Sequence, residues 1–419
     1  MKETLTFTNA SLGPIKANKE APVEIDVRPL TVFIGVQGSG KSLASQLLYF
    51  LRNAPYLISQ YANELKDPTE VTRKVVDGLR SGRLTGRDLS TFVSAGTAQI
   101  HYTQENGKGS SKALKRSISI NSSMHTIAPI KNFGKEIDSI LAKRYENPSG
   151  QIPSNAMFIP AERTFFSRFL NSELRLFSSD ALPFTMLEFS NILTRGREMY
   201  VEWQKNKAET PKEVTDIDEI VGNALRGQIR YEKAGPYSGT WQWLPQGGDR
   251  PIQIEMASSG QMEAWPLIFA AETAFGLPDS ERPQFLHIEE PEAHLHPSAQ
   301  VAMVHLLAYL VNKGFRVLVT THSLTVLYAL NNLMAAYQML PDKTYPDVPA
   351  ENVRLNPDDL SAYLFTGDGV EEVSYPMDGL RQIEEGRLGE VLGDLQVGFN
   401  RILAYATYEG NEKDASHSA

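Results

Sequence analysis

The hydrophobic pattern of the chain contains three short apolar runs, at residues 30–34, 284–288 and 315–319. Runs of this length, rich in β-branched and aromatic residues, predict strands that are buried in a parallel sheet. Leucines at helical spacing follow the first run over residues 43–51, and a helical pattern follows the third run over residues 324–340. The pattern therefore predicts an α/β fold in which helices flank a central sheet.

The remaining patterns predict further elements around this sheet. Residues 97–122 predict a β-hairpin, and residues 165–230 predict a mainly helical region. We also expect two or three strands at 5–34, helices at 60–87, 262–275 and 380–408, strands at 228–256 and 347–377, and a polar end at 411–419. The helical region has no sustained heptad pattern, so a long coiled coil is not expected.

The residues after the first apolar run fit the phosphate-loop pattern G-x-x-x-x-G-K-[ST]. They read Gly35-Val36-Gln37-Gly38-Ser39-Gly40-Lys41-Ser42. Between a strand and a helix, such a loop points main-chain N–H groups at a phosphate chain, and the helix N-terminus favours the anion. We expect Lys41 to reach the β- and γ-phosphates of ATP and Ser42 to give its hydroxyl to Mg²⁺. The alternative is a Gly/Ser turn before an ordinary helix.

Two acidic residues, Glu289 and Glu290, follow the second apolar run directly. In a Walker B arrangement Glu289 would hold Mg²⁺ through water, and Glu290 would orient and deprotonate the attacking water. Neighbouring carboxylates at the end of a buried strand repel each other, and a bound cation removes much of that cost. The alternative is a strand that ends in a solvated acidic turn.

The third apolar run ends in Thr320-Thr321-His322. This spacing places His322 at the carboxyl edge of the predicted sheet, where ligands bind in open α/β folds. There it could donate a hydrogen bond to the γ-phosphate. For a histidine taken alone, a structural role is the alternative.

A second serine-glycine turn lies at Ser258-Ser259-Gly260-Gln261, between strand-like residues 252–256 and the predicted helix at 262–275. A helix N-terminus of this kind predicts a second anion site. Because the chain has one phosphate loop, we expect this turn to cap the γ-phosphate of ATP bound by another copy. Helix N-capping by Ser258 or Ser259 is the alternative.

In this order the four motifs resemble those of the ATP-binding-cassette ATPases, and more narrowly the RecF, SMC and OLD branch. The run Ile288-Glu289-Glu290-Pro291-Glu292-Ala293-His294-Leu295-His296-Pro297 is similar to the E-E-P-E-A-H-L-H-P run of that branch. The resemblance covers nearly the whole chain. It implies a P-loop α/β fold with a mixed sheet flanked by helices, which binds ATP and Mg²⁺.

The resemblance also assigns roles along the chain. Lys41 and Ser42 match Walker A, residues 258–261 match the signature loop, Glu289 and Glu290 match Walker B and the catalytic base, residues 294–297 match the dimer-contact loop, and His322 matches the switch histidine. Residues 156–164 resemble the strand and loop that replace the Q-loop. The chain departs from the family at Ser259, Gln37 and Glu289, which stand where glycine, asparagine and aspartate are usual. A Q-loop glutamine is not evident.

The expected organisation is a single head over residues 1–419. Its nucleotide-binding core would comprise 1–55 and 250–340, with an insert at 56–230 that holds the hairpin and a helical lobe. A C-terminal α/β extension would follow at 341–410. Glu292, His294 and His296 could also suggest a metal site, but the family's loop accounts for the same residues.

Composition narrows the partners. The 419 residues include no cysteine, which excludes thiol chemistry, and no run long enough for a membrane span, so we expect a cytoplasmic protein without a membrane partner. The net charge of −9 argues against unspecific coating of nucleic acid. Lys108, Lys112, Lys115 and Arg116 nevertheless make the hairpin basic, so contact with DNA or RNA stays open beside a merely solvated tip.

We expect from the resemblance an ATPase subunit that forms a homodimer, or a higher homo-oligomer, head-to-tail on ATP. Many bacterial proteins of this kind serve in anti-phage defence and control an effector. Residues after His322 contain no D-x-D cluster in a fitting strand pattern, so we expect any nuclease to be a separate effector protein. A RecF-like DNA-repair clamp is the main alternative, and a transporter nucleotide-binding subunit is a weaker one.

Overall fold

The computed structural model describes residues 2–8, 11–12, 15–17, 20–64, 70, 97–105, 113–121, 126–129, 132–146, 152–169, 183–233, 239–248, 250–341, 343, 345–367, 369–377, 379–385, 389 and 396–401. Its centre is a six-stranded sheet in the order β16-β15-β5-β14-β13-β9. The strands are β16 (Gly369–Glu372), β15 (Leu360–Thr366), β5 (Leu30–Ile34), β14 (Arg316–Thr321), β13 (Phe285–Glu289) and β9 (Ala156–Ile159). All neighbours are parallel except β15 and β16.

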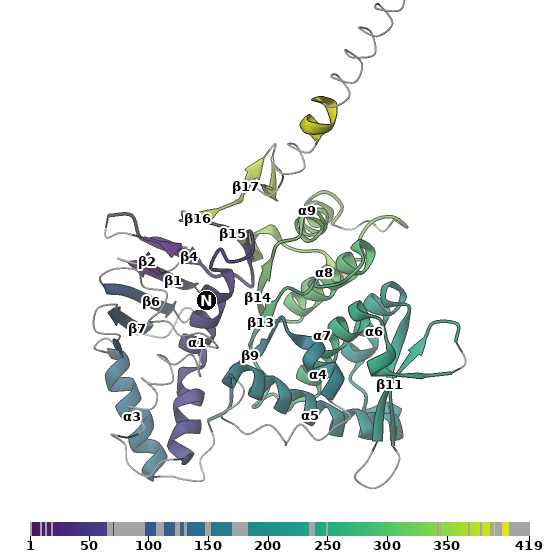
Figure 1. Cartoon of the computed structure of the whole chain (residues 1–419), viewed down its shortest axis with the longest axis horizontal. Helices are drawn as coiled ribbons and strands as arrows, with labels where there is room; N and C mark the ends of the chain where they lie inside the picture. The colour runs from purple at the N-terminus through teal and green to yellow at the C-terminus, as the bar shows by residue number, and fades with distance from the viewer. Residues whose placement is uncertain are drawn as a thin grey trace, which may run out of the picture.

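A second, antiparallel sheet has the order β4-β1-β6-β7-β8. It is built from β1 (Lys2–Thr8), β4 (Val23–Asp26), β6 (Thr97–Glu105), β7 (Leu114–Asn121) and β8 (Thr126–Pro129). Helix α1 (Lys41–Glu64) lies between the two sheets, and α3 (Asn132–Glu146) packs beside it (Figure 1). Short strand pairs complete the N- and C-terminal parts: β2 (Ser11–Leu12) with β3 (Ile15–Lys16), and β17 (Ser374–Met377) with β18 (Leu380–Ile383).

The other face of the central sheet is covered by helices (Figure 1). They are α4 (Arg163–Phe169), α5 (Phe184–Lys205), α6 (Lys212–Leu225), α7 (Ser259–Gly276), α8 (Pro297–Asn312) and α9 (Leu324–Met339). A three-stranded sheet of β10 (Gly227–Lys233), β11 (Gly239–Pro245) and β12 (Ile252–Gln253) packs against α6 and α7. No helix in the described ranges is long and apolar enough to cross a lipid bilayer.

The sequence of β5 explains why the sheet is covered on both faces. Side chains alternate along a strand, so Leu30, Val32 and Ile34 join the core with α7 and α8, while Phe33 joins the core around α1. Every residue of β5 is buried. A strand that is apolar on both faces is the kind that only a doubly covered parallel sheet accommodates.

A buried charge network ties α1 to both sheets. Arg52 on α1 donates to the Glu3 carboxylate on β1 at 2.6 and 2.8 Å, and its Nη1 lies 3.0 Å from His287 Nε2 on β13. Arg316 on β14 donates to the same carboxylate at 3.2 Å. Burial and Arg52 keep the pKa of His287 well below its usual value. Because breaking a buried pair leaves a charge uncompensated, this network makes the register between the sheets specific.

Most predicted elements are confirmed, and two are wrong. Of the predicted strand at 252–256, only β12 is a strand, and residues Ile254–Met256 form a 3-10 helix. The predicted helix at 380–408 begins with strand β18 instead. Strands β9 and β15 show that the central sheet also draws on the ranges expected to be insert and extension. The hairpin tip at 106–112, most of 60–87 and the end at 411–419 lie outside the described residues.

Candidate nucleotide-binding site

The predicted phosphate loop lies between β5 and α1 and has a glycine-dependent backbone. Gly35, Gly38 and Gly40 have φ values of 146°, 77° and 98°, which favour glycine. A Cβ on Gly35 would lie 2.3 Å from the carbonyl oxygen of Phe365 on β15. The loop therefore needs glycine both for its turn and for its packing against the neighbouring strand.

The ammonium group of Lys41 lies inside the loop. Its Nζ donates to the carbonyl oxygens of Gly35 at 2.6 Å and Val36 at 2.8 Å. Burial lowers the pKa of Lys41, and the negative charges of Glu290, Glu292 and Glu289 oppose that shift. The loop is thus built around one cation that faces three carboxylates, while Val36, Gln37 and Gly38 lie on its exposed rim.

Strand β13 brings Glu289 and Glu290 to the same edge of the sheet. Glu289 is 5 % exposed and ends the strand, opposite Thr320 on β14. Glu290 N–H donates to the Thr320 carbonyl at 2.9 Å, which extends the pairing by one residue. The φ of Glu290 is 43°, an uncommon value for a residue other than glycine. Its side chain leaves the strand direction there and turns toward β14.

A fully buried arginine, Arg163, holds the main chain of both acids. Its Nη1 donates to the carbonyl of Glu289 at 2.5 Å and its Nη2 to the carbonyl of Glu290 at 2.8 Å. The same guanidinium donates to the carbonyl of Pro160 at 2.8 Å and to that of Glu263 on α7 at 3.0 Å. The Glu263 carboxylate lies 3.8 Å from Nη2 and balances the charge. Sequence reasoning gave Arg163 no definite role.

The side chain of Glu292 holds the end of β14 and the main chain that follows it. Its buried carboxylate accepts hydrogen bonds from Thr321 Oγ1 at 2.5 Å and from the main-chain N–H of His322 at 3.1 Å. From the sequence, Glu292 is expected only in the family's loop or in a possible metal site. Within the described part of the chain, no group of three or more His, Cys, Asp and Glu side chains has a geometry that could hold a metal. His296 instead caps α8 by accepting from Ser298 N–H.

His322 and Glu290 face each other across the edge. His322 Nδ1 lies 3.7 Å from Glu290 Oε1 and 3.9 Å from Glu292 Oε1. The nearby Glu290 carboxylate raises the pKa of His322, and the nearby His322 imidazole lowers the pKa of Glu290. Lys41 and Arg163 lower the Glu290 pKa further. Glu290 is therefore a carboxylate at neutral pH, which is the form required of a general base.

The serine-glycine turn begins α7, as predicted, and it also caps that helix. Ser258 Oγ accepts from Gln261 N–H, and the Gln261 side chain accepts from Ser258 N–H at 3.0 Å, which completes a capping box. Ser258 and Ser259 are exposed. A Cβ on Gly260 would lie 2.7 Å from the carbonyl oxygen of His294, so this turn packs directly on the loop after β13.

The polar atoms at this edge of the sheet suit a ligand that consists of phosphate groups and a metal ion. Four buried side-chain oxygens have no hydrogen-bond partner among the described residues: Ser39 Oγ, Gln46 Oε1, Thr320 Oγ1 and Glu292 Oε2. They come from the phosphate loop, the first turns of α1, and the ends of β13 and β14. Buried polar atoms normally find partners, so a polar ligand at this edge would complete the site.

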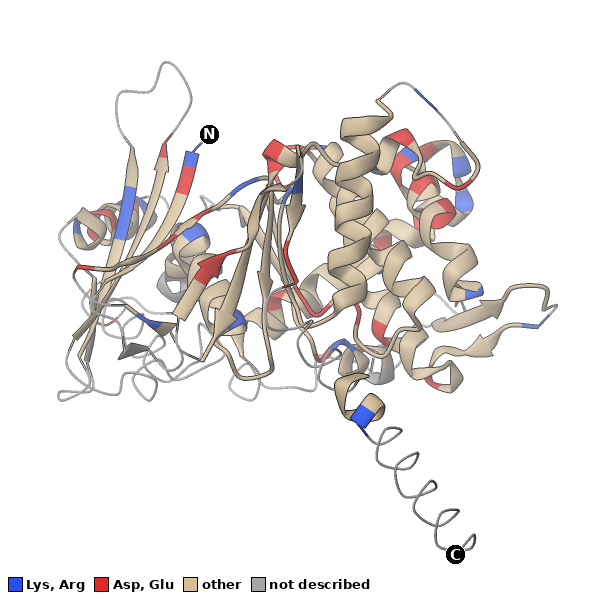
Figure 2. Ribbon diagram, turned by 90° about the horizontal axis from the view of Figure 1, so that it is seen from above, with Lys and Arg blue, Asp and Glu red and all other residues tan. Residues whose placement is uncertain are grey.

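Of the basic residues predicted for the hairpin, Lys115 is exposed, but Arg116 is not. Arg116 is 5 % exposed, pairs with Glu136 at 2.6 Å, and donates to the carbonyls of Leu51 and Arg52. Its charge therefore stabilises α1 and α3 and does not face solvent. Lys108 and Lys112 lie outside the described residues. Figure 2 shows basic and acidic residues interspersed over the described part of the chain.

Comparison with known proteins identifies the class of fold. A family model described as the AAA ATPase domain matches residues 90–327, and the chain belongs to that family. The matched range includes α7, β13 and β14 with Glu289, Glu290 and His322, and it begins after the phosphate loop. A search of curated proteins gave no match.

Three solved structures of SMC heads are similar over most of their length. One is an SMC head bound to the C-winged helix domain of ScpA, with 14 % identity, a TM-score of 0.48, and coverage of 90 % of this chain and 98 % of that chain. A Pyrococcus furiosus head with an extended coiled coil has 13 % identity, a TM-score of 0.42 and coverages of 94 % and 99 %. A Thermotoga maritima head has 10 % identity, a TM-score of 0.40 and coverages of 90 % and 99 %.

Proposed function

We propose that the chain binds ATP with Mg²⁺ and hydrolyses it at the edge formed by β5, β13 and β14. One observation carries the proposal: the phosphate-loop cation Lys41 lies at the same sheet edge as the Glu290 carboxylate, which is 3.7 Å from His322 Nδ1. A cation for the phosphates and a charged base on the neighbouring strands are the parts that phosphoryl transfer to water requires. Packing of the loop on β15 holds them in place.

Each residue then has a definite task. The main-chain N–H groups from Gly35 to Ser42 and the Lys41 ammonium would bind the phosphates, and Ser42 and Glu289 would hold Mg²⁺. The metal would supply neutralisation of the charge that develops on the phosphate oxygens. Glu290 would accept a proton from the attacking water, and His322 would keep that carboxylate aimed and ionised. Arg163 would fix the backbone from which Glu290 projects.

We also propose that two copies share the site head-to-tail. Ser258 and Ser259 are exposed, and no acceptor among the described residues is placed for the main-chain N–H groups of Ser259 and Gly260. Such a helix start suits a γ-phosphate presented by another chain. Exposed apolar side chains border both halves, since Val36 in the phosphate loop is 60 % exposed and Met256 before the turn is 75 % exposed. Head-to-tail pairing of two chains would cover both of these side chains.

Mixed variants test the shared site. Lys41→Ala and Ser258→Arg chains should each be inactive alone, and mixing them should restore part of the ATPase activity, because one site per mixed dimer escapes both changes. The matched control mixes Lys41→Ala with Glu290→Gln. Both of these changes damage the same half, so every site in that mixture stays defective. Equal activity in the two mixtures, with mixed dimers confirmed by mass, would refute the head-to-tail arrangement.

We further propose that closure of the dimer controls a separate effector, such as a nuclease, in bacterial anti-phage defence. The exposed side chains of Tyr328 and Met339 support a partner surface, since both line a pocket of about 840 Å³ along α8 and α9. Co-purification with Glu290→Gln as bait in ATP, and with Lys41→Ala as control, tests this. ATP-dependent binding of gapped DNA without a protein partner would favour the repair-clamp alternative.

A further inference from the structure

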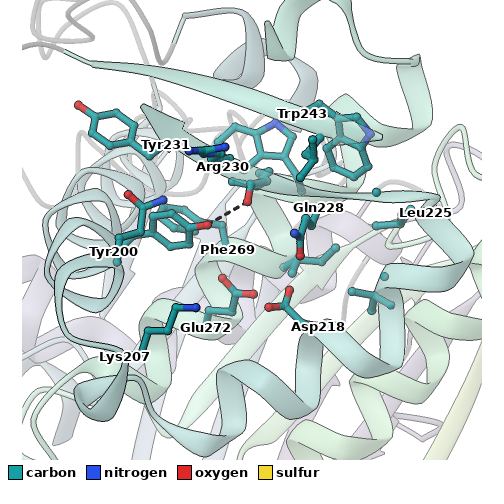
Figure 3. Close-up of a pocket in the computed structure, with 18 residues that line it drawn as sticks. Tyr200, Lys207, Asp218, Leu225, Gln228, Arg230, Tyr231, Trp243, Phe269 and Glu272 are labelled. Atoms are coloured by element: carbon teal, nitrogen blue, oxygen red, sulfur yellow. Dashed lines mark hydrogen bonds between the residues drawn. The ribbon is translucent and has the colours of Figure 1, made fainter. Parts of the chain in front are cut away.

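A partly open pocket lies away from the sheet edge, between α5, α6, α7, β10 and β11 (Figure 3). Its volume is about 530 Å³, which is within the usual range of small-molecule sites. Five aromatic side chains line it: Tyr200, Tyr231, Trp243, Trp265 and Phe269. None of the residues assigned above to ATP or Mg²⁺ belongs to its lining.

Two carboxylates point into this space from different helices. Figure 3 shows Glu272 of α7 and Asp218 of α6 directed toward each other. Glu272 is 6 % exposed, and among the described residues it has no hydrogen-bond or ion-pair partner. Asp218 is solvent-exposed, but the protein around its carboxylate raises its pKa to about 6, whereas burial, together with Asp218, raises the pKa of Glu272 well above its usual value. An unpaired buried carboxyl group is costly and contributes nothing to folding here.

The cations near the pocket do not neutralise these acids. Lys207 and Arg230 belong to the lining but are exposed, and no ion pair joins either of them to Glu272 or Asp218. The inner wall instead consists of aromatic rings, whose faces attract positive charge. Tyr200, Trp265 and Phe269 pack with one another, with centroid separations of 6.0 Å for Tyr200–Phe269 and 5.8 Å for Trp265–Phe269. The wall is therefore formed before any ligand enters.

We propose that this pocket binds a small organic cation, whose amine or guanidinium group pairs with Glu272 and Asp218 while its body lies against the aromatic wall. A positive group would compensate both carboxylates, and the aromatic wall favours an organic cation over a fully hydrated ion. This cation site is separate from the proposed ATP site, and the proposal does not rest on ATP hydrolysis. Helix α7 begins at Ser259, about 20 Å from Glu272 by helical rise, so the pocket and the serine-glycine turn lie on the same helix.

Titration of the purified chain without nucleotide tests the site. The probes are 2-phenylethylamine, agmatine and spermidine, and binding is followed by calorimetry and by tryptophan fluorescence. We expect at least one of these cations to bind saturably, and its affinity to fall at least tenfold in Glu272→Gln and in Asp218→Asn. Glu213→Gln is the matched control, because Glu213 lies on α6 but pairs with Lys313 outside the pocket. The affinity of the Glu213→Gln variant for the cation should equal that of the wild type.

Three outcomes would overturn the proposal. The first is that none of the three cations binds the wild type. The second is that Glu272→Gln binds them as tightly as the wild type does. The third is that the neutral analogue 2-phenylethanol or the anion phenylacetate binds as tightly as 2-phenylethylamine. Thermal unfolding of each variant confirms its fold, and Glu272→Gln should be at least as stable as the wild type, because it removes an unpaired buried acid.

Discussion

Arg163 donates to the main-chain carbonyl of Glu290 at 2.8 Å, and that residue has a φ of 43°. A backbone in this region persists only where its surroundings hold it. The guanidinium also contacts Glu289, Pro160 and Glu263, so one side chain connects the edge strand β9, the strand end of β13 and helix α7. The orientation of the proposed base is thus set by an arginine that has no contact with solvent.

Arg163→Met should destabilise the protein by about 3 to 5 kcal/mol, because it leaves the Glu263 charge without a counter-ion and several buried carbonyls without a donor. Arg163→Lys should be nearly as harmful, since one ammonium group cannot reproduce the planar set of donors. Denaturant unfolding measures both. The control is Arg195→Met, which removes an exposed pair with Glu281 and should cost less than about 1 kcal/mol. A loss at Arg163 no larger than at Arg195 contradicts this account.

Glu290→Gln should retain binding of ATP and Mg²⁺ but slow hydrolysis by roughly a hundredfold or more, because the amide cannot accept the proton. The backbone contact with Arg163 remains, so the variant should fold normally. Steady-state turnover and nucleotide affinity are the measurements. Glu255→Gln, on the 3-10 helix before α7, is a control that keeps the base. Turnover equal to that of the wild type would place the base elsewhere.

The His322–Glu290 pair predicts a pH dependence of stability. The pKa of Glu290 is lowered from 4.5, so its contribution is present above pH 4.5 and is lost as pH falls through the folded-state pKa. The pKa of His322 is raised from 6.5, so its contribution is present below pH 6.5 and is lost as pH rises through the folded-state pKa. The pair therefore contributes fully between about pH 4.5 and 6.5.

His322→Gln tests that coupling through the rate of hydrolysis. Without the imidazole, the pKa of Glu290 should move up toward 4.5, because His322 is the main cause of its depression. The acid limb of the rate profile should then shift to higher pH. His305→Gln is a control, since His305 is far from the candidate site on α8 and contacts neither acid in the described structure. An unshifted acid limb in His322→Gln would show that another group titrates.

Gly260→Ala should impair hydrolysis while ATP binding at the phosphate loop persists. The new Cβ would lie 2.7 Å from the carbonyl of His294, so α7 and the loop after β13 must separate. We expect a loss of about 1 to 3 kcal/mol in unfolding free energy and a larger fractional loss in turnover. Gly134→Ala in α3 is the matched control, because no atom lies within 4 Å of its added Cβ. Similar turnover in both variants would contradict the packing argument.

The strands, turns and helix starts around this candidate site could be predicted from the sequence, because short-range chemistry encodes them. An apolar strand before G-x-x-x-x-G-K-[ST] and acids at the end of another strand need no long-range information. N-capping by Ser258, which the sequence offered as the alternative at this turn, is present together with Gln261 in a capping box, and it is compatible with an exposed anion site at the same turn.

Contacts between residues that are far apart in the chain could not be predicted in this way. Nothing in the pattern at residues 347–377 shows that β15 joins β5 in the sheet centre, since both neighbours of β5 come from distant parts of the chain. Arg163 looks like any helix-start arginine until its carbonyl acceptors are assembled. From the sequence, Arg116 looks like a solvent-facing charge. Its partner Glu136 lies in a helix that folds back onto the hairpin, and the local pattern does not show this.

The position of β5 has a consequence for how the chain is made. The strand before the phosphate loop is synthesised long before its pairing partners β14 and β15, and Glu3 pairs with Arg316, which lies 313 positions later in the chain. Until those partners are made, an apolar strand has two open edges, which favours pairing with other chains. Folding should therefore be late and slow, and yield in cells should depend on chaperones more than on the stability of the finished protein.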